Sequence, residues 1–167
     1  TAVVLFTVGG ASVMNILHDG FDCVIRTGAL PEDGVIARPL GKLTMVNCAS
    51  PHYLTRFGYP QSPDDLTSHA IVRYTPHLGV HPLGFEVASV NGVQWFKSGG
   101  MLTVNSSENY LAAGLAGLGI IQIPRIAVRE ALRAGRLIEV LPGYRAEPLS
   151  LSLVYPQRRE LSRRVNL

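Results

Sequence analysis

Hydrophobic residues fall into short unbroken runs and into helically spaced positions, separated by glycine, proline and aspartate. The runs predict buried strands, and the spaced positions predict helices. The predicted strands span residues 2–6, 22–26, 35–40, 43–49, 70–74, 85–90, 93–96, 101–104, 120–123, 137–141 and 149–155. The predicted helices span residues 11–19, 51–57, 63–66, 106–118 and 126–134, with a final one beginning at 162. Alternation of strands and helices is typical of an α/β protein with mostly parallel sheet.

The stretch of residues 105–124 organises the rest of the chain. Ser106 or Ser107 is a good helix N-cap, and Glu108 lies in the first turn. Gly119 is predicted to end this helix, because glycine adopts the left-handed conformation without strain. The strand that follows ends at Pro124. A polar-capped helix start that follows a strand is suited to binding an anion or a carboxylate.

Composition indicates a globular protein without a membrane span. Of 167 residues, 47% are apolar and 16% are charged, which is typical of a packed interior. No apolar run approaches the roughly 20 residues of a membrane-spanning helix. The net charge of +3 comes from scattered arginines, which do not form a nucleic-acid-binding run. Cys23 and Cys48 lie in apolar runs and are interpreted as buried, reduced thiols of a cytoplasmic protein.

The sequence contains no recognisable catalytic, metal-binding or cofactor-binding motif. The glycines of residues 114–119 precede a strand, whereas a dinucleotide-binding motif follows one. His77 and His81 are four residues apart, but the prolines around them disfavour a helical metal site. We therefore expect no catalytic residue, no metal and no cofactor.

Four stretches, in this order and spacing, resemble the effector-binding part of LysR-type transcriptional regulators. The first reads GFDCVIRTG from Gly20 and the second VIARPLG from Val35. The third reads CASPHYL from Cys48, and the fourth is the organising stretch itself. The fourth continues into residues 130–142 and 153–156. Together these stretches cover almost the whole chain.

The resemblance implies a two-lobed fold like that of type 2 periplasmic binding proteins, with mostly parallel sheets and flanking helices. Lobe I would comprise residues 1–48 and 151–167, and lobe II residues 49–150. The winged helix-turn-helix of the family, its linker helix and the first strand and helix of lobe I are not found in the sequence. We therefore expect a fragment of a longer regulator, with lobe I incomplete.

The resemblance also implies that a small, anionic effector binds in the cleft between the lobes. Further implied partners are a second copy of the chain, as homodimer or tetramer, and DNA, contacted only through the missing N-terminal domain. No membrane contact is expected. The residues that the resemblance assigns to the effector site are Arg26, Thr27, Gly28, Ser50, Pro51, Ser106, Ser107, Gly119, Ile120 and Pro124.

Simpler interpretations remain open for several of these residues. Ser106 is equally well explained as a plain N-cap, and Arg26 as part of an ion pair within its lobe. The arginines near the C-terminus fit a solvated helix face better than a DNA-binding patch: Arg158, Arg159, Arg163 and Arg164. Two other classes of protein share this fold, namely solute-binding proteins and some enzymes.

Overall fold

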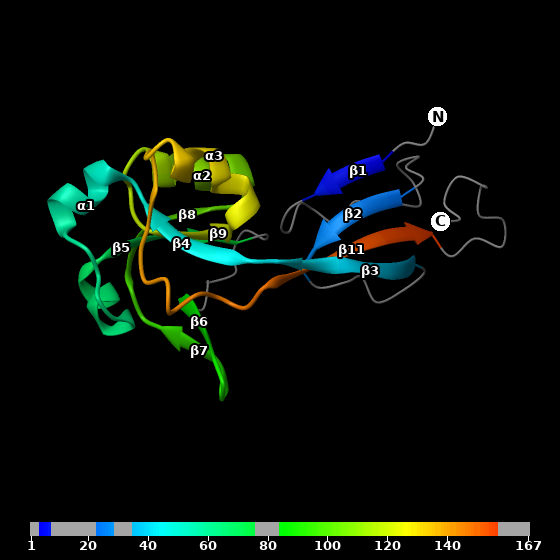
Figure 1. Cartoon of the computed structure of the whole chain (residues 1–167), viewed down its shortest axis with the longest axis horizontal. Coiled ribbons are helices and arrows are strands. Elements are labelled where there is room, and N and C mark those ends of the chain that lie inside the picture. Colours follow the sequence, from blue (N-terminus) through cyan, green and yellow to red (C-terminus); the bar gives the residue numbers. More distant parts are fainter. Residues whose placement is uncertain (1–3, 8–22, 29–34, 76–83, 157–167) are drawn as a thin grey trace. The chain divides into compact units, whose positions relative to one another are not determined.

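A computed structural model describes residues 4–7, 23–28, 35–75 and 84–156 (Figure 1). The chain divides into two compact units. The first unit comprises Thr1–Lys42 and Leu149–Leu167, and the second comprises Leu43–Pro148. The division falls after Lys42, whereas the family resemblance implied one after Cys48. It falls earlier because residues 45–49 form strand pairs only within the second unit.

Several predictions concern residues outside the described ranges. They are the helix at residues 11–19, the turn at residues 30–34, most of the loop after Thr75 and the helix from residue 162. The histidines and arginines in this group are His18, His77, His81, Arg158, Arg159, Arg163 and Arg164.

The first unit contains one sheet, in the order β1-β2-β11-β3. Its strands are β1 (Val4–Thr7), β2 (Cys23–Thr27), β3 (Val35–Leu43) and β11 (Leu149–Pro156). β1 pairs with β2 in parallel, as the strand–helix–strand pattern predicted. β11 pairs with β2 in the antiparallel direction. Val24 and Val154 face each other in this pair and are buried, with Val35 and Ala37 packed against them.

The second unit contains a larger sheet. Its strands are β4 (Met45–Ala49), β5 (Ala70–Tyr74), β8 (Gly99–Val104), β9 (Ile121–Pro124) and β10 (Ile138–Glu139). The pair β5-β8 joins the group β10-β4-β9 through a single parallel bridge between Ile71 and Ile120. In this bridge the Ile120 amide donates to the Ala70 carbonyl at 2.9 Å, and the Val72 amide donates to the Ile120 carbonyl at 3.0 Å. The combined order is β10-β4-β9-β5-β8.

The strand directions correct one part of the predicted fold. β5 is parallel to β8 and, at the bridge, to β9. However, β4 is antiparallel to both β9 and β10, as β11 is to β2. Among the described ladders, antiparallel pairs therefore outnumber parallel ones. The prediction failed because β4 and β11 are the segments that enter and leave the second unit, and they lack the crossover helix that makes a neighbouring strand parallel.

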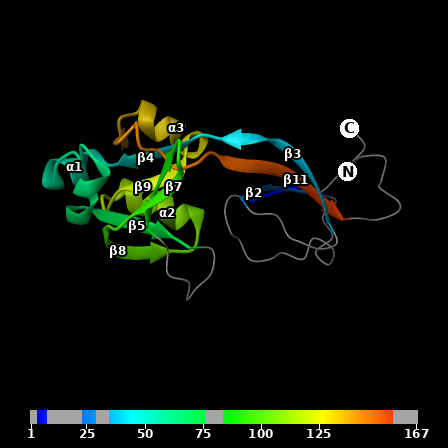
Figure 2. The same cartoon turned by 90° about the horizontal axis from the view of Figure 1, so that it is seen from below.

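Each face of the second sheet is covered by different elements (Figure 1). The helix face packs against α2 (Ser107–Leu115) and α3 (Arg125–Arg133), with Val72 and Ile121 in its core. The hairpin face carries Ala49, Ile71 and Ile120. It packs against α1 (Pro51–Phe57), η1 (Pro63–Ser68), β6 (Phe85–Ser89) and β7 (Gly92–Phe96). Figure 2 shows β5 and β8 side by side at one margin of this unit.

Two details of the predicted helices differ in the structure. α2 ends at Leu115, and Gly117, with φ of 78°, is the left-handed residue after the cap. The Leu118 amide donates to the Ala113 carbonyl at 3.1 Å, which completes a Schellman turn two residues before the predicted end. In α3, Ile126 is one of the helically spaced apolar residues, yet it is 68% exposed. Gly135, with φ of 68°, is the left-handed residue that follows the C-cap of α3.

Candidate functional site

The parallel strands β5, β8 and β9 all end at the same edge of the second sheet. We call this the C-terminal edge and define it by Thr75, Ser106 and Pro124. The register Tyr74 to Val104 places the ends of β5 and β8 side by side. From β5 the chain continues to β8 on one side, while from β9 it continues through α3 to β10 on the other. Neighbouring parallel strands whose connections diverge in this way form a topological switch point, where α/β proteins bind ligands.

Ser106 begins α2 at this edge. Its hydroxyl accepts a hydrogen bond from the Asn109 amide at 3.1 Å, and its carbonyl accepts one from the Tyr110 amide at 3.0 Å. Ser106, not Ser107, is therefore the N-cap. The first turn of a helix presents amides that have no acceptor within the helix, together with a partial positive charge. The C-terminal edge thus has a local preference for negatively charged groups, although the exposed Glu108 opposes it.

Tyr110 occupies the space between β5 and β9 near this edge. Its hydroxyl accepts a hydrogen bond from the Gln122 amide at 2.9 Å, in place of a backbone group of β5. Its ring packs edge-on against Tyr74, with centroids 5.7 Å apart. Burial raises the pKa of Tyr110 well above that of an ordinary tyrosine. Because a side chain replaces the ladder here, β5 and β9 pair only at the Ile71 bridge and not at their C-terminal ends.

Thr75 lies just beyond the predicted strand of residues 70–74, and its burial was not predicted from the sequence. The Thr75 amide donates to the Val104 carbonyl at 2.9 Å, so the pairing of β5 with β8 continues for one residue beyond the strand. Its side chain is only 4% exposed. The proline-rich sequence that follows gave no signal for this burial, which comes from β8.

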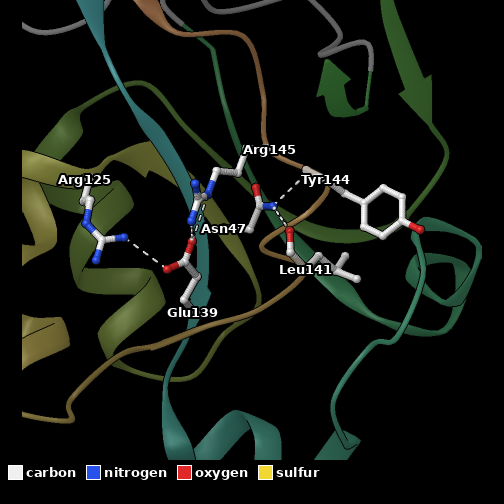
Figure 3. Close-up of polar contacts among 6 residues, drawn as sticks. All are labelled: Asn47, Arg125, Glu139, Leu141, Tyr144 and Arg145. Atoms are coloured by element: carbon white, nitrogen blue, oxygen red, sulfur yellow. Dashed lines mark hydrogen bonds and ion pairs between the residues drawn. The ribbon is translucent and has the colours of Figure 1, made fainter. Parts of the chain in front are cut away.

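The side-chain amides of Asn47 and Gln122 form a hydrogen-bond network on the hairpin face of the sheet. Gln122 Nε2 donates to Asn47 Oδ1 at 2.9 Å and to the Glu86 carbonyl at 2.8 Å. Asn47 Nδ2 in turn donates to the Leu141 and Tyr144 carbonyls at 3.2 and 2.8 Å (Figure 3). Both side chains are satisfied, so this network fixes β6 and the returning chain and leaves no orphan to bind a ligand.

Arg125 adds positive charge next to Pro124. Its Nη1 lies 3.1 Å from Glu139 Oε2, and Arg145 Nη2 lies 2.6 Å from Glu139 Oε1 (Figure 3). Two guanidinium groups therefore share one carboxylate, which leaves the cluster with a net positive charge. The Arg125 side chain is about half exposed, so its field extends into solvent at the C-terminal edge.

Ser50 lies at the opposite edge of the sheet and not beside Ser106. β4 is antiparallel to β9, with Met45 opposite Pro124 and Cys48 opposite Ile121. Ser50, which follows β4, is consequently near the start of β9 and a strand length away from Pro124. It is 2% exposed, and its hydroxyl caps α1 by accepting from the Tyr53 amide at 3.2 Å.

The predicted residues of the second unit thus form two groups. Ser106, Ser107 and Pro124 lie at the C-terminal edge. Ser50, Pro51, Gly119 and Ile120 lie at the other edge, which we call the N-terminal edge. A Cβ atom at Gly117 would lie 3.0 Å from Ser50 Oγ, and one at Gly119 would lie 2.6 Å from the Ala70 carbonyl oxygen. Ser50, Gly119 and Ile120 are therefore part of tight internal packing, while Pro51 is exposed.

The predicted residues of the first unit lie at the end of β2. Thr27 is 3% exposed and stands opposite Leu151, while Arg26 stands opposite Ser152. Gly28 has φ of 84°, and its amide donates to the Ser150 carbonyl at 3.1 Å. These contacts explain the local turn, and the assignment of the three residues to the effector site stays a prediction.

Other candidate chemistry is limited to buried cysteines. Cys23 and Cys48 are both buried and form no disulfide, as predicted. Burial, with a smaller contribution from Glu139, raises the pKa of the Cys48 thiol to about 12, so this thiol is protonated at neutral pH. Among the described residues there is no group of three or more metal-binding side chains. In the same part of the chain, no helix has the length and apolar character needed to cross a membrane.

The sequence and fold match proteins of one family. A family model described as the LysR substrate binding domain matches residues 1–167. HTH-type transcriptional regulator YhjC of Escherichia coli K12 is 98% identical over 154 residues, which cover 92% of this chain and 52% of that protein. An HTH-type transcriptional regulator of Haemophilus influenzae is 34% identical over 148 residues, which cover 89% of this chain and 51% of that protein. The chain thus spans about half the length of the curated relatives it matches.

A solved structure agrees with these sequence matches. The regulatory domain of CrgA, a LysR-type transcriptional regulator from Neisseria meningitidis, superposes with a TM-score of 0.76 at 25% sequence identity. The match covers 92% of this chain and 74% of that structure. The similarity confirms the predicted fold class, which is the two-lobed α/β architecture.

Proposed function

Because the chain belongs to the LysR substrate-binding domain family, we propose that it is the effector-sensing part of a cytoplasmic transcription regulator. The relatives named above are called HTH-type transcriptional regulators, which favours a regulator over a solute-binding protein or an enzyme. The chain matches about half of each relative, so DNA would be contacted by another part of a longer protein. Self-association as a homodimer or tetramer belongs to the same proposal.

The effector we propose is a small organic anion that binds at the C-terminal edge of the second unit. The observation that carries this proposal is the convergence at one edge of three parallel strand ends and the capped start of α2. This edge is also the switch point between β5 and β9, where strand connections leave space for a ligand. A negative group near a helix N-terminus gains roughly 0.3–1 kcal/mol when exposed and more when sheltered.

The residues at this edge have distinct roles in the proposal. Ser106 and the first turn of α2 supply hydrogen-bond donors, and Thr75 and Pro124 line the surface next to them. Arg125 contributes positive field, because its cluster carries two guanidinium groups and one carboxylate. This proposal gives Ser50 and Gly119 no role, because both are packed at the N-terminal edge. A contribution of Arg26, Thr27 and Gly28 in the first unit to effector binding rests on the family resemblance alone.

The proposal can be tested with a charge placed at the helix start. We would measure binding of a panel of small carboxylates to the chain and to Ser106→Asp. Aspartate is as good an N-cap as serine, so the helix is kept while a negative charge faces the anion. The expected result is a loss of affinity of about fivefold or more, because like charges a few ångströms apart repel by about 1 kcal/mol or more even in water.

Ser68→Asp is the matched control. Ser68 is exposed at the end of η1, away from the C-terminal edge, and takes the same change in charge. It should leave affinity unchanged. Equal affinity of a carboxylate for the wild-type chain and Ser106→Asp would contradict the assigned site. Failure of every carboxylate to bind would contradict the anionic effector.

A further inference from the structure

The hairpin of β6 and β7 has one covered edge and one open edge. On the covered edge, the Ala88 amide donates to the Arg145 carbonyl at 2.8 Å. The Glu86 amide donates to Gln122 Oε1 at 3.0 Å, and the Glu86 carbonyl accepts from Gln122 Nε2 at 2.8 Å. β7 forms the open edge, because β6 is its one strand partner in the part of the chain that the structure describes. Figure 1 shows this hairpin projecting from the second unit.

The hydrogen bonds of β6 fix the direction of the backbone groups of β7. Opposite residues of an antiparallel pair either exchange backbone hydrogen bonds or both direct these groups away from each other. Glu86 stands opposite Trp95, and Ala88 stands opposite Val93. Glu86 and Ala88 direct their amides away from β7, so Trp95 and Val93 direct theirs away from β6. At the open edge, the amides and carbonyls of Val93 and Trp95 have no hydrogen-bond partner among the described residues.

The exposed face of the hairpin adds apolar side chains to the open edge. Phe85, Val87 and Phe96 pack in the core of the second unit. Side chains alternate along a strand, so Val93 and Trp95 lie on the opposite face, where they are 37% and 46% exposed. β7 has neither a charged residue nor a proline, the residues that commonly protect an edge strand from pairing. The open edge is therefore suited to pairing with another strand.

A second copy of β7 fits this edge in one register. Antiparallel pairing about a two-fold axis at Gln94 places Val93 of each copy opposite Trp95 of the other. Each outward amide then meets an outward carbonyl, so the partial charges of the two edges are complementary. A two-fold axis at Val93 or Trp95 would pair that residue with itself and place the other opposite a residue outside β7. The axis at Gln94 is thus the register that uses all the open backbone groups.

The side chains agree with the same register. Val93 and Trp95 lie on one face of β7, so each valine faces the indole of the other copy across the junction. Contacts between aromatic and β-branched residues stabilise antiparallel strand pairs. Because β7 is uncharged, no like charges meet at the two-fold axis. A second copy therefore complements the open edge in backbone donors and acceptors, in apolar side chains and in charge.

We propose that β7 pairs with β7 of a second copy of the chain, which forms one continuous antiparallel sheet in the order β6-β7-β7-β6. The inference rests on the self-association proposed above, to which it assigns an interface. The opposite edge of β6 is already covered by Gln122 and Arg145, so the sheet does not extend further. The contact is self-complementary about a two-fold axis and therefore closes as a dimer.

The test uses opposite charges at Gln94, which is exposed and lies on the proposed axis. Gln94→Lys and Gln94→Glu each place like charges opposite each other, whereas an equal mixture of the two pairs unlike charges. Sedimentation velocity of the whole chain over a dilution series measures the dissociation constant of the dimer. It should rise about fivefold or more in either variant alone and return to the wild-type value or below in the mixture.

Fluorescence gives a second readout, because Trp95 is the single tryptophan of the chain. Its emission in the wild-type chain should move to shorter wavelength as the dimer forms and the indole leaves water. Ala127→Lys and Ala127→Glu are the matched controls, since Ala127 is exposed on α3 and takes the same charges. Both controls should associate like the wild type, alone and mixed.

Three results would overturn the proposal. The wild-type chain stays monomeric with constant Trp95 emission, Gln94→Lys associates as tightly as the wild type, or the mixture associates no better than each variant alone. A dimer that persists unchanged in Gln94→Lys would place self-association on another surface and leave that part of the proposed function standing. None of these results bears on the effector site, because carboxylate binding at the Ser106 edge is measured separately.

Discussion

The two edges of the second sheet carry the same local motif in different surroundings. Ser50 and Ser106 each cap a helix, and each hydroxyl accepts from the amide three residues ahead, at 3.2 and 3.1 Å. Ser50 is 2% exposed and lies against Gly117, whereas Ser106 is half-buried at the C-terminal edge. A capped helix start is therefore not by itself a binding site. Strand direction decides which of the two lies at the switch point.

The packed N-terminal edge should tolerate change least. Gly119→Ala would place a Cβ atom 2.6 Å from the Ala70 carbonyl oxygen, a backbone atom that cannot move aside. We expect the free energy of unfolding to fall by about 3 kcal/mol, the upper range for overpacking. Urea denaturation measures it. Gly143→Ala is the control, because nothing lies within 4 Å of the added atom. Similar stability of both variants would contradict tight packing at this edge.

At the other edge, the critical contact is the Tyr110 hydroxyl. Tyr110→Phe leaves the partly buried Gln122 amide without its acceptor at 2.9 Å. The expected loss of unfolding free energy is about 2 kcal/mol, the cost of an unsatisfied buried donor. Tyr59→Phe, at an exposed tyrosine, should change stability little. If both variants unfold at the same urea concentration, the Tyr110 hydroxyl does not replace a backbone hydrogen bond between β5 and β9.

Removal of the two cap hydroxyls should give a smaller difference in the free energy of unfolding than the substitutions above. Ser50→Ala should cost about 2 kcal/mol of unfolding free energy and Ser106→Ala about 0.5 kcal/mol, the two ends of the range for N-cap removal. At the buried cap no water can replace the lost hydroxyl, whereas at the partly exposed cap water can. Thermal denaturation of both variants under one condition measures the order. A reversed order would mean that the edges differ in some way other than burial.

A pH effect on stability should come from the N-terminal edge. His69 is 6% exposed, and its Nδ1 lies 3.0 Å from the Tyr53 hydroxyl. Burial lowers the pKa of His69 below 6.5, although Asp65 opposes the shift. The unfolded chain therefore binds a proton more readily than the folded one, and stability falls as pH drops below about 6.5.

His69→Gln should flatten this fall in stability between pH 6.5 and the lowered pKa. Measurement of the unfolding free energy across that interval, for wild type and variant, tests the sign. His52→Gln serves as control, because His52 is exposed at the start of α1. A slope that survives in His69→Gln would assign the effect to another group.

Elements with strong local signals were predicted well from the sequence. β5 spans Ala70–Tyr74 and α1 spans Pro51–Phe57, both as predicted. The predicted strands 85–90 and 93–96 are confirmed as β6 and β7, which form a hairpin that turns at Asn91 and Gly92. In each case a cap, a turn dipeptide or a β-branched run lies within the element itself.

What the sequence did not reveal depends on partners far away in the chain. Gly119 was interpreted as a helix end, but its need for glycine comes from Ala70. Thr75 is buried by pairing with Val104, and Tyr110 binds the Gln122 amide across the gap between strands. The predicted site combined strand ends without knowing their directions. It therefore joined Ser50 to Ser106, which the antiparallel pairing of β4 separates.

The most direct test is an NMR map of the amide shifts caused by the tightest carboxylate from the binding panel. If the C-terminal edge is the effector site, the largest shifts in the second unit should fall on Thr75 and on residues 105–109. The amides of residues 50–53 and 117–120 should stay in place. Shifts concentrated on residues 50–53 and 117–120, with residues 105–109 unaffected, would contradict the account.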